Sequence, residues 1–323
     1  MSRWTLPDGR PVDRLTLTGG GLSAHLLTLG ATVQDLRIEG VDHPLVLGCT
    51  DPADYLDEGL YMGAIVGRFA NRIGGARFAL DGREYRTDPN FRGRHTLHGG
   101  TRGTHWHLWS VEEARDDRAA LSLALPDGEM GFPGTLSIRA DIALRDHALV
   151  LDLTAWTDAP TPCNLAYHGY FNLDGSGDLR GHRLRIAADR YLPVDDDLIP
   201  LPGVAPVDGT RFDFRQGRAL APGGYDHNLC LSDGPAAPRV VAELTGQGGI
   251  SMQIETDQPG LQVYDGAHFS GLPGLDGRRY GPFAGVALET QGWPDAPNRP
   301  DFPDAILRPG QIWRRHTAYR FVR

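Results

Sequence analysis

Short runs of alternating apolar and polar residues mark much of the chain as β-strand. The clearest run is SIRADIAL at 137–144, whose larger apolar side chains fall on one face of an extended strand and whose polar ones fall on the other. ALVLDLTAW follows at 148–156, so residues 145–147 are predicted to form a hairpin turn. Similar patterns occur at 15–18, 24–29, 31–38, 250–255 and 311–322.

Helical periodicity is nearly absent. Only residues 51–57, where Pro52 follows Asp51, predict a short helix, because proline suits the first helical turn. Glycine (42) and proline (24) together form about a fifth of the 323 residues, against a usual share near 12%. Many turns and few long helices are therefore expected, and the predicted fold class is mostly β.

No composition break, low-complexity linker or repeat divides the chain. We therefore expect residues 1–323 to form a single domain, a large antiparallel β-sandwich. Long loops connect the predicted strands, and nearly all polar clusters lie in these loops. A rigid β scaffold commonly carries its binding groups in such places.

The charge balance argues against polyanionic partners. The formal net charge is -9, so a neutral small molecule is expected as partner, and neither nucleic acid nor a membrane surface is. The segment MSRWTLPDGRPVDR has no apolar signal core, and no run approaches the ~18 apolar residues of a membrane span. Cys49, Cys163 and Cys230 form no C-x-x-C pair, which favours a cytoplasmic location.

One segment stands out because it lacks charge. Residues 161–173, TPCNLAYHGYFNL, contain no Lys, Arg, Asp or Glu, although 23% of the chain is charged. His168 alone can titrate there near neutral pH, and such an imidazole can act as a general acid or base. Asn164, Tyr170 and Asn172 carry groups of the kind that bind a polyol. A buried strand and turn with a hydrogen-bonded core histidine would show the same pattern.

Two further segments carry candidate binding groups. In GAIVGRFANRIGGARF at 63–78, Asn71 and Arg72 precede a Gly-Gly turn, and Arg68 lies on the same segment. Arginine presents a rigid fork of donors that can bridge two sugar hydroxyls, although arginines beside turns are often only solvated or salt-bridged. His98 lies in LHGG at a predicted strand end, where the glycines let a ligand approach the backbone closely.

A metal site is the other interpretation of the histidines in residues 90–109. His105 and His107, followed by Glu112, match the first half of a cupin metal motif. The second half is incomplete and retains only Pro222, Gly224 and His227. His105 and His107 are also expected on a strand with Trp106 and Leu108 alternating between them. We therefore expect no metal site, and the absence of GxGxxG and P-loop sequences argues against a nucleotide cofactor.

Two acidic residues complete the candidate set. Asp226 lies just before the apolar residues 229–231, where its carboxylate could accept hydrogen bonds from a hydroxylated ligand, although aspartate is also a common turn former. Glu289 ends the apolar run 286–288, so desolvation should raise its pKa and make it a better base. An ion-paired strand-end glutamate is the structural alternative. Trp293 either stacks on a sugar or caps the core.

Taken in order, these clusters resemble the aldose 1-epimerase family, also called the galactose mutarotases. Each shared motif is short and weak alone, but the occurrence of so many motifs in the same order is specific to the family. They run nearly end to end and include VLG at 46–48, GxxxGRxANRI at 63–73, LDGREY at 80–85, LHGG at 97–100, DGExGFPG at 127–134, HxYFNL at 168–173, YDH at 225–227, GLQVY at 260–264, LETQ at 288–291, PDAPN at 294–298 and LRPG at 307–310.

The resemblance implies a large antiparallel β-sandwich that uses neither a cofactor nor a metal and interconverts the α and β anomers of free aldoses. It implies that Glu289 is the general base and His168 the general acid. The residues that it implies for sugar binding are Asn71, Arg72, His98, Tyr170, Asp226 and Gln262. The substrate would be galactose, glucose or a pentose, and the protein would be a monomer or a homodimer.

Two other functions remain open on the sequence alone. A sugar-phosphate (hexose-6-phosphate) 1-epimerase would need a second basic residue in the pocket, for which Arg68 and Arg94 are the candidates. A non-catalytic carbohydrate-binding protein would keep Arg72, His98 and Asp226 without needing an acid and a base.

Overall fold

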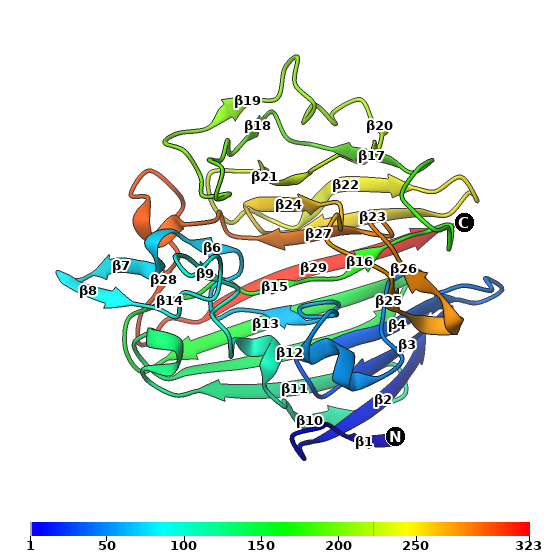
Figure 1. The fold of residues 1–323 in the computed structure, drawn as a ribbon, viewed down its shortest axis with the longest axis horizontal. Coiled ribbons are helices and arrows are strands. Elements are labelled where there is room, and N and C mark those ends of the chain that lie inside the picture. The colour runs from blue at the N-terminus through cyan, green and yellow to red at the C-terminus, as the bar shows by residue number, and fades with distance from the viewer. Residues whose placement is uncertain (1, 222) are drawn as a thin grey trace.

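The computed structural model describes residues 2–221 and 223–323, and these form β-strands, turns and short 3-10 helices (Figure 1). The pairings within its large sheets are antiparallel. The predicted fold class, mostly β with large antiparallel sheets, is confirmed. Pro222, part of the partial metal pattern, lies outside the described residues.

A nine-stranded sheet forms the base of the molecule. In Figure 1 its strands follow one another from bottom to top. Their order is β10 (Ser110–Ala114), β11 (Arg118–Leu125), β12 (Leu136–Arg145), β13 (Ala148–Thr157), β29 (Trp313–Val322), β23 (Ser251–Thr256), β22 (Arg239–Thr245), β17 (Arg183–Ile186) and β20 (Arg218–Ala219).

Two smaller sheets complete the main scaffold. The six-stranded sheet has the order β16 (Tyr170–Phe171), β27 (Val286–Gln291), β24 (Gly260–Tyr264), β21 (Asp226–Cys230), β18 (Arg190–Tyr191) and β19 (Ala205–Pro206). The four-stranded sheet has the order β1 (Ser2–Thr5), β2 (Pro11–Gly19), β3 (Leu22–Leu27) and β4 (Thr32–Ile38).

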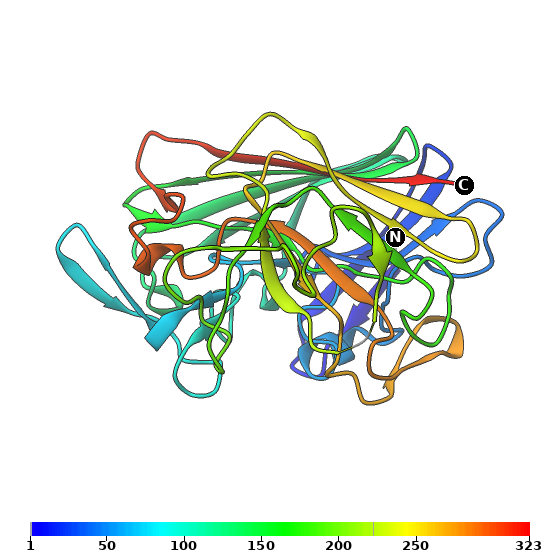
Figure 2. The ribbon, with the colours of Figure 1, turned by 90° about the horizontal axis from the view of Figure 1, so that it is seen from above.

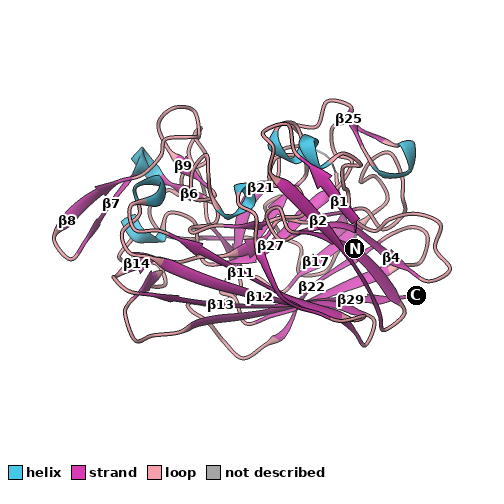
Figure 3. Cartoon of the chain, turned by 90° about the horizontal axis from the view of Figure 1, so that it is seen from below, coloured by secondary structure: helices cyan, strands magenta, loops and turns pink. Residues whose placement is uncertain are grey.

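The remaining elements are short and lie mostly in the long loops. Two-stranded pairs join β5 (Ile65–Val66) to β15 (Ala166–Tyr167), β6 (Arg72–Ile73) to β9 (Thr96–Leu97), β7 (Arg77–Leu80) to β8 (Arg83–Arg86), β14 (Thr161–Pro162) to β28 (Ile306–Leu307) and β25 (Leu272–Pro273) to β26 (Arg279–Tyr280). The 3-10 helices are η1 (Pro52–Leu56), η2 (Gly74–Ala76), η3 (Thr104–Trp106), η4 (Glu129–Gly131), η5 (Leu275–Gly277) and η6 (Ala296–Asn298). Figure 3 shows the short helices on the side away from β13 and β29.

The main core lies between the two largest sheets, which Figure 2 shows as layers containing β29 (red) and β27 (orange). Leu288 of β27 and Leu261 of β24 belong to one hydrophobic cluster with Ile138 and Leu151 of the nine-stranded sheet. Burying an aliphatic side chain of this kind contributes about 1.5–3 kcal/mol. Because successive residues of a strand face opposite sides, the neighbours of Leu288 and Leu261 face away from this core.

The strand predictions are confirmed. The alternating runs lie within β2, β3, β4, β12, β13, β23 and β29 or overlap them by most of their length. Arg145 pairs with Ala148 across the predicted hairpin. Asp146 and His147 have φ values of 50° and 58°, as the tight turn that matches the twist of paired strands requires.

The short helix predicted at 51–57 is present as the 3-10 helix η1. The side chain of Asp51 caps it by accepting a hydrogen bond from the N–H of Ala53 at 2.9 Å. Among the described residues, no helix is long and apolar enough to cross a membrane.

The strand expected around His105 and His107 is wrong. Thr104–Trp106 form the 3-10 helix η3 instead. The Thr104 hydroxyl donates to the carbonyl of Ile65 at 2.6 Å, and the Trp109 indole N–H donates to the carbonyl of Thr104 at 3.1 Å. These contacts with distant backbone fix a turn that the local alternation of residues did not reveal.

Candidate active site

The pairings of the six-stranded sheet place polar side chains in one row. Glu289 of β27 lies opposite Gln262 of β24, which lies opposite Asn228 of β21. Since Leu288 and Leu261 face the core, Glu289 and Gln262 face the other side of the sheet. Their side chains are nevertheless buried, because the loops cover that side. The fold therefore buries the Glu289 carboxyl group and the Gln262 amide between the sheet and the loops.

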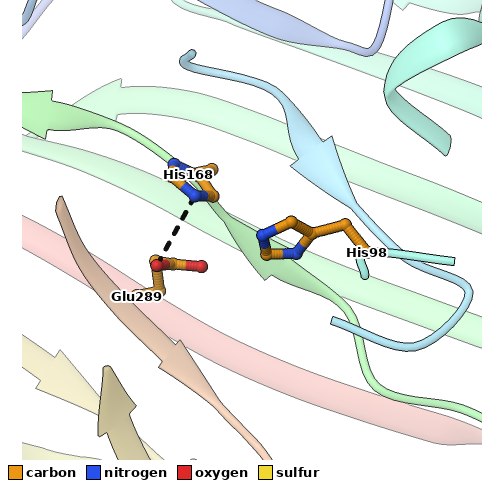
Figure 4. Close-up of side chains that lie close together, drawn as sticks. All are labelled: His98, His168 and Glu289. Atoms are coloured by element: carbon orange, nitrogen blue, oxygen red, sulfur yellow. Dashed lines mark ion pairs between the residues drawn. The ribbon is translucent and has the colours of Figure 1, made fainter. Parts of the chain in front are cut away.

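His168 is held beside Glu289 by two short strand pairings. It lies between β15, which pairs with β5, and β16, which pairs with β27. Its backbone N–H donates to the carbonyl of Ala64 at 2.9 Å, and its carbonyl accepts from the N–H of Gly63 at 2.8 Å. Figure 4 shows Nε2 of His168 pointing toward the Glu289 carboxyl group, 3.6 Å from Oε1. Glu289 Oε2 has no hydrogen-bond partner among the described residues.

His98 follows β9, and its tautomer is fixed by the backbone. Its Nδ1 accepts the N–H of Asn71 at 3.1 Å, so the neutral ring must carry its proton on Nε2. The His98 ring lies 5.1 Å from the His168 ring, centroid to centroid. The next residue must be glycine, because a Cβ on Gly99 would lie 2.1 Å from the carbonyl oxygen of Gly67. His98 thus offers a hydrogen-bond donor beside His168.

Arg72 and Asp226 form the other polar wall of the site. Arg72 Nη2 lies 2.9 Å from Asp226 Oδ2, and Gln262 Nε2 donates to Asp226 Oδ1 at 2.5 Å. The Arg72 guanidinium also lies over the ring of Phe91, 4.6 Å from its centroid. Asn71 Oδ1 accepts the backbone N–H of Arg72 at 2.9 Å, which leaves the Asn71 amide nitrogen for a ligand. Each predicted side chain here is held by its neighbours.

Asp265, which the sequence analysis missed, holds the turn before Asp226. Its Oδ2 accepts the backbone N–H groups of Gly223, Gly224 and Tyr225 at 3.1, 2.8 and 3.2 Å. Convergent N–H groups of this kind form a concave anion site. The Asp265 carboxylate therefore fixes the backbone that carries Asp226.

These residues surround one cavity of about 460 Å³, a volume in the range of small-molecule sites. Glu289, His168, His98, Asn71, Arg72, Tyr170 and Asp226 all line it. Gln262 is not among the lining residues and contacts the cavity through Asp226. The sequence analysis missed several other lining residues, among them Tyr61, Phe91, Leu198, Tyr264 and His268. A slightly larger cavity of about 520 Å³, around residues 320–323, contains none of the predicted site residues.

Burial shifts both titratable groups of the central pair toward their neutral forms. Desolvation raises the pKa of Glu289 well above its ordinary value, and the nearby carboxylate of Asp226 raises it further. Desolvation lowers the pKa of His168 to about 4. The 3.6 Å contact between them is therefore not an ion pair at rest. A neutral pair that shares a single titratable proton describes it better, because such groups titrate as a unit.

Several polar residues of the predicted segments have structural roles instead. Asn164 and Asn172 bond backbone groups of neighbouring loops. Trp293 is 3% exposed, donates its indole N–H to the carbonyl of Pro259 at 3.0 Å and packs against Phe302. Trp293 therefore caps the core and does not stack on a sugar.

The side chains around the cavity do not fit a metal ion well. His98, His168 and Glu289 are the one group of three potential ligands within the described ranges whose ligand atoms all lie within 4.8 Å of one another. His98, however, would have to bind through Nε2 while Nδ1 already accepts the N–H of Asn71. Both nitrogens would then lack a proton, whereas a metal-bound histidine normally donates its second N–H.

The cupin-like residues are not brought together in the part of the chain that the structure describes. Glu112 accepts a hydrogen bond from Ser122. His107 Nε2 lies 3.1 Å from the carbonyl of Arg102, and His105 is buried against Tyr61.

Known proteins resemble this chain over nearly its whole length. The family model described as "Aldose 1-epimerase" matches residues 13–320. The galactose mutarotase of Rattus norvegicus is 38% identical over 97% of this chain and 95% of its own, and the aldose 1-epimerase of Escherichia coli K12 is 36% identical over 98% and 97%. Among solved structures, an aldose epimerase homologue from C. elegans has a TM-score of 0.90 at 29% identity, covering 96% of this chain and 99% of its own. The galactose 1-epimerase of Lactobacillus acidophilus has a TM-score of 0.86 at 26% identity, with 99% and 97% covered.

The burial of His168 predicts an unusual titration. Because the imidazolium is desolvated, His168 should take up a proton only near pH 4, as its lowered pKa indicates, and not near the ordinary 6.5. NMR of the histidine ring protons, with His168 assigned from the His168→Asn spectrum, measures this midpoint. His316 is the control, since its hydrogen bond to Asp152 raises its pKa. A His168 midpoint at the ordinary value would contradict the buried pair.

Proposed function

The chain belongs to the aldose 1-epimerase family, and from that premise we propose that it interconverts the α and β anomers of a free aldose with Glu289 as the general base and His168 as the general acid. The observation that carries this assignment is the buried contact of 3.6 Å between His168 Nε2 and Glu289 Oε1 at the wall of the cavity. A carboxyl group and an imidazole so placed can each take up and release a proton within one catalytic cycle.

The reaction needs two proton transfers in each direction. Glu289 removes the proton from the O1 hydroxyl while His168 protonates the ring oxygen, and the bond from C1 to the ring oxygen breaks to give the open-chain aldehyde. Rotation about C1–C2 presents the other face of the carbonyl. Closure then reverses both transfers, so that the opposite anomer leaves, Glu289 is again a carboxylate and His168 is again protonated.

The shared proton makes this cycle possible without exchange with solvent. The ionised pair, Glu289 carboxylate with His168 imidazolium, holds the same number of protons as the neutral pair of the empty site. Ring opening moves one proton from His168 to the sugar and another from the sugar to Glu289. The open-chain aldehyde is therefore accompanied by the neutral pair, which burial favours.

The remaining polar groups of the cavity are proposed to bind the sugar hydroxyls. His98 offers its Nε2–H and Asn71 its amide N–H groups, both beside the catalytic pair. Asp226 offers carboxylate acceptors and Arg72 the donors left free by their contact. Tyr170 supplies a buried phenol, whose pKa desolvation raises well above the ordinary value, so that it stays protonated.

Gln262 takes a different role from the one that the resemblance implied. Its amide holds the Asp226 carboxylate from behind the cavity wall. We therefore propose that Gln262 orients Asp226, and that the Asp226 carboxylate accepts hydrogen bonds from the sugar.

The family acts on aldoses, and we propose galactose, glucose or a pentose as the substrate here. A sugar phosphate is less well supported. Arg68 is 1% exposed and donates to backbone carbonyls away from the cavity. Arg94 and the cavity-lining Arg92 both contact Asp197, at 2.7 Å. Each basic group considered for a phosphate is thus already engaged.

The organisation of the whole protein is also a proposal. We infer that residues 1–323 form a single domain, because the nine-stranded sheet joins strands from residue 110 to residue 322. A net charge of -9 supports the proposal that it binds neither nucleic acid nor a membrane. Its free, buried cysteines are compatible with a cytoplasmic location. We propose a monomer or a homodimer, which sedimentation would distinguish.

Polarimetry tests the proposed activity. At least one of freshly dissolved α-glucose, α-galactose and arabinose should reach its equilibrium rotation faster with the protein than in buffer, at a rate proportional to protein concentration. Glucose 6-phosphate serves as the comparison for the sugar-phosphate alternative. Rates equal to the buffer blank on all three free sugars would contradict the proposal. Acceleration of glucose 6-phosphate alone would then favour a sugar-phosphate epimerase, and no acceleration at all would leave a carbohydrate-binding role.

Metal independence is a second expectation, because His98 has no nitrogen lone pair free for an ion. Dialysis against a chelator should leave the mutarotation rate unchanged. Activity that is lost on dialysis and restored by one divalent ion would place a metal in the reaction and overturn the proton-transfer scheme.

The roles of the central pair can be separated from sugar binding. Glu289→Gln keeps the shape of the side chain but removes its basicity, and His168→Asn keeps a polar group but removes the titratable proton. Each variant should lose on the order of 10²-fold or more in kcat, with sugar affinity changed far less. Trp156→Phe, at an exposed position on β13, is a control that should keep the wild-type rate. A folded Glu289→Gln enzyme with near wild-type turnover would move the base to Asp226.

A further inference from the structure

We propose that Tyr61 is a positioning residue for both histidines of the cavity, whose ring orients His98 and His168 and keeps water from His168. The proposal rests on the function assigned to His168 above and adds a residue from outside the family motifs in the sequence. Tyr61 lies in the loop between η1 and β5 and lines the cavity.

The ring of Tyr61 lies close to three imidazoles at once. Its centroid lies 4.6 Å from that of His98, 6.1 Å from that of His168 and 4.5 Å from that of His105. The contact with His168 is nearly parallel, at an interplanar angle of 28°, and the contact with His98 is tilted, at 56°. Distances and offsets of this kind are those at which aromatic rings attract one another. No other aromatic ring among the described residues lies within such reach of both His98 and His168.

Hydrogen bonds tie Tyr61 to the segments that carry these histidines. Its hydroxyl accepts from Asn90 Nδ2 at 3.3 Å, and the same amide group bonds the backbone N–H and carbonyl of Leu97, directly before His98. On the other side, Gly63 and Ala64 follow Tyr61 closely and form the backbone hydrogen bonds to His168. The Tyr61 hydroxyl hydrogen remains available to a ligand in the cavity.

The backbone of Tyr61 adds a second kind of observation. Its φ is 70°, a left-handed conformation that a bulky side chain seldom adopts. Strain of this kind persists where the surrounding structure requires it, often at functional sites. Asparagine and glycine accept this conformation more readily than tyrosine does. An aromatic ring therefore occupies the position although the backbone conformation is unfavourable for it.

His168 is the group whose protonation should report on the Tyr61 ring. The polar groups around His168 are Glu289, His98 and Tyr170, the last two with ring centroids both at 5.1 Å, and the more distant Arg72, Asp226 and His268. Burial is the largest cause of its low pKa. Removal of the Tyr61 ring would admit water beside the imidazole, which stabilises the imidazolium and raises this pKa toward the ordinary value.

Two substitutions separate the ring from the hydroxyl. Tyr61→Phe keeps the ring, so kcat and the pH profile should match the wild type and KM should rise by less than about tenfold, the effect of one lost hydrogen bond. Tyr61→Asn removes the ring and suits the left-handed backbone. It should lower kcat by roughly 10²-fold, as misplacement of catalytic groups does. The acid limb of its kcat/KM profile should also move upward from about pH 4, the wild-type pKa of His168.

Controls make each outcome informative. Tyr85→Asn removes a half-buried aromatic ring that stacks on Phe78 in the β7–β8 hairpin and should change neither kcat nor the pH profile. If Tyr61→Asn does not fold, Tyr61→Gly carries the same test.

A folded ring-less variant with the wild-type kcat and acid limb would overturn the positioning role, as would a Tyr61→Phe enzyme as impaired as Tyr61→Asn. If Glu289→Gln or His168→Asn kept the wild-type kcat, the proposed acid and base roles would fail independently of Tyr61.

Discussion

This site depends on one constraint. A carboxylic acid and an imidazole are buried side by side and share a single titratable proton. In water both groups would be charged between about pH 4.3 and 6.5, their ordinary pKa values. Burial of Glu289 and His168 disfavours every state in which the pair carries net charge. The pair therefore keeps one proton over a wide pH range, and a bound sugar supplies the hydroxyl and ring oxygens that let this proton change places.

The β-scaffold satisfies this constraint through simple alternation. Leu288 enters the core between the sheets, and the next residue, Glu289, must then face the loops. The pairing of β16 with β27 brings the His168 segment to the same place, and the pairing of β6 with β9 places His98 after a strand end. Several polar residues of the cavity are also fixed by bonds to their neighbours, as Asp226 is by Arg72 and Gln262. Preorganised groups of this kind lose little entropy when the sugar binds.

The sequence allowed the fold class to be predicted, and seven of the eight residues that it singled out for the site line the cavity, for reasons visible in particular residues. Period-two alternation identified the long strands, and the absence of charged neighbours singled out His168. The apolar run before Glu289 predicted its desolvation. The roles of these residues came from the family resemblance and stay proposals, because spacing along the chain does not fix the distance between residues 168 and 289.

Contacts between distant segments account for what the sequence did not reveal. Tyr61 lies beside His98 and His168 only because three loops converge. The role of Asp265 is visible only in the hydrogen bonds that it accepts from the turn at residues 223–225. The turn at Thr104 is fixed by the carbonyl of Ile65, which a local pattern cannot show. Trp293 and Asn164 lie near site motifs in the chain, yet tertiary packing directs them to structural contacts.

The pH dependence of kcat/KM, measured by polarimetry, tests the buried one-proton pair most directly, because this quantity reports the ionisations of the free enzyme. We predict a profile that is flat through neutral pH and has its acid limb near pH 4, where the pair binds a second proton. An acid limb near 6.5, the ordinary pKa of histidine, would show that His168 is well solvated and would contradict the account.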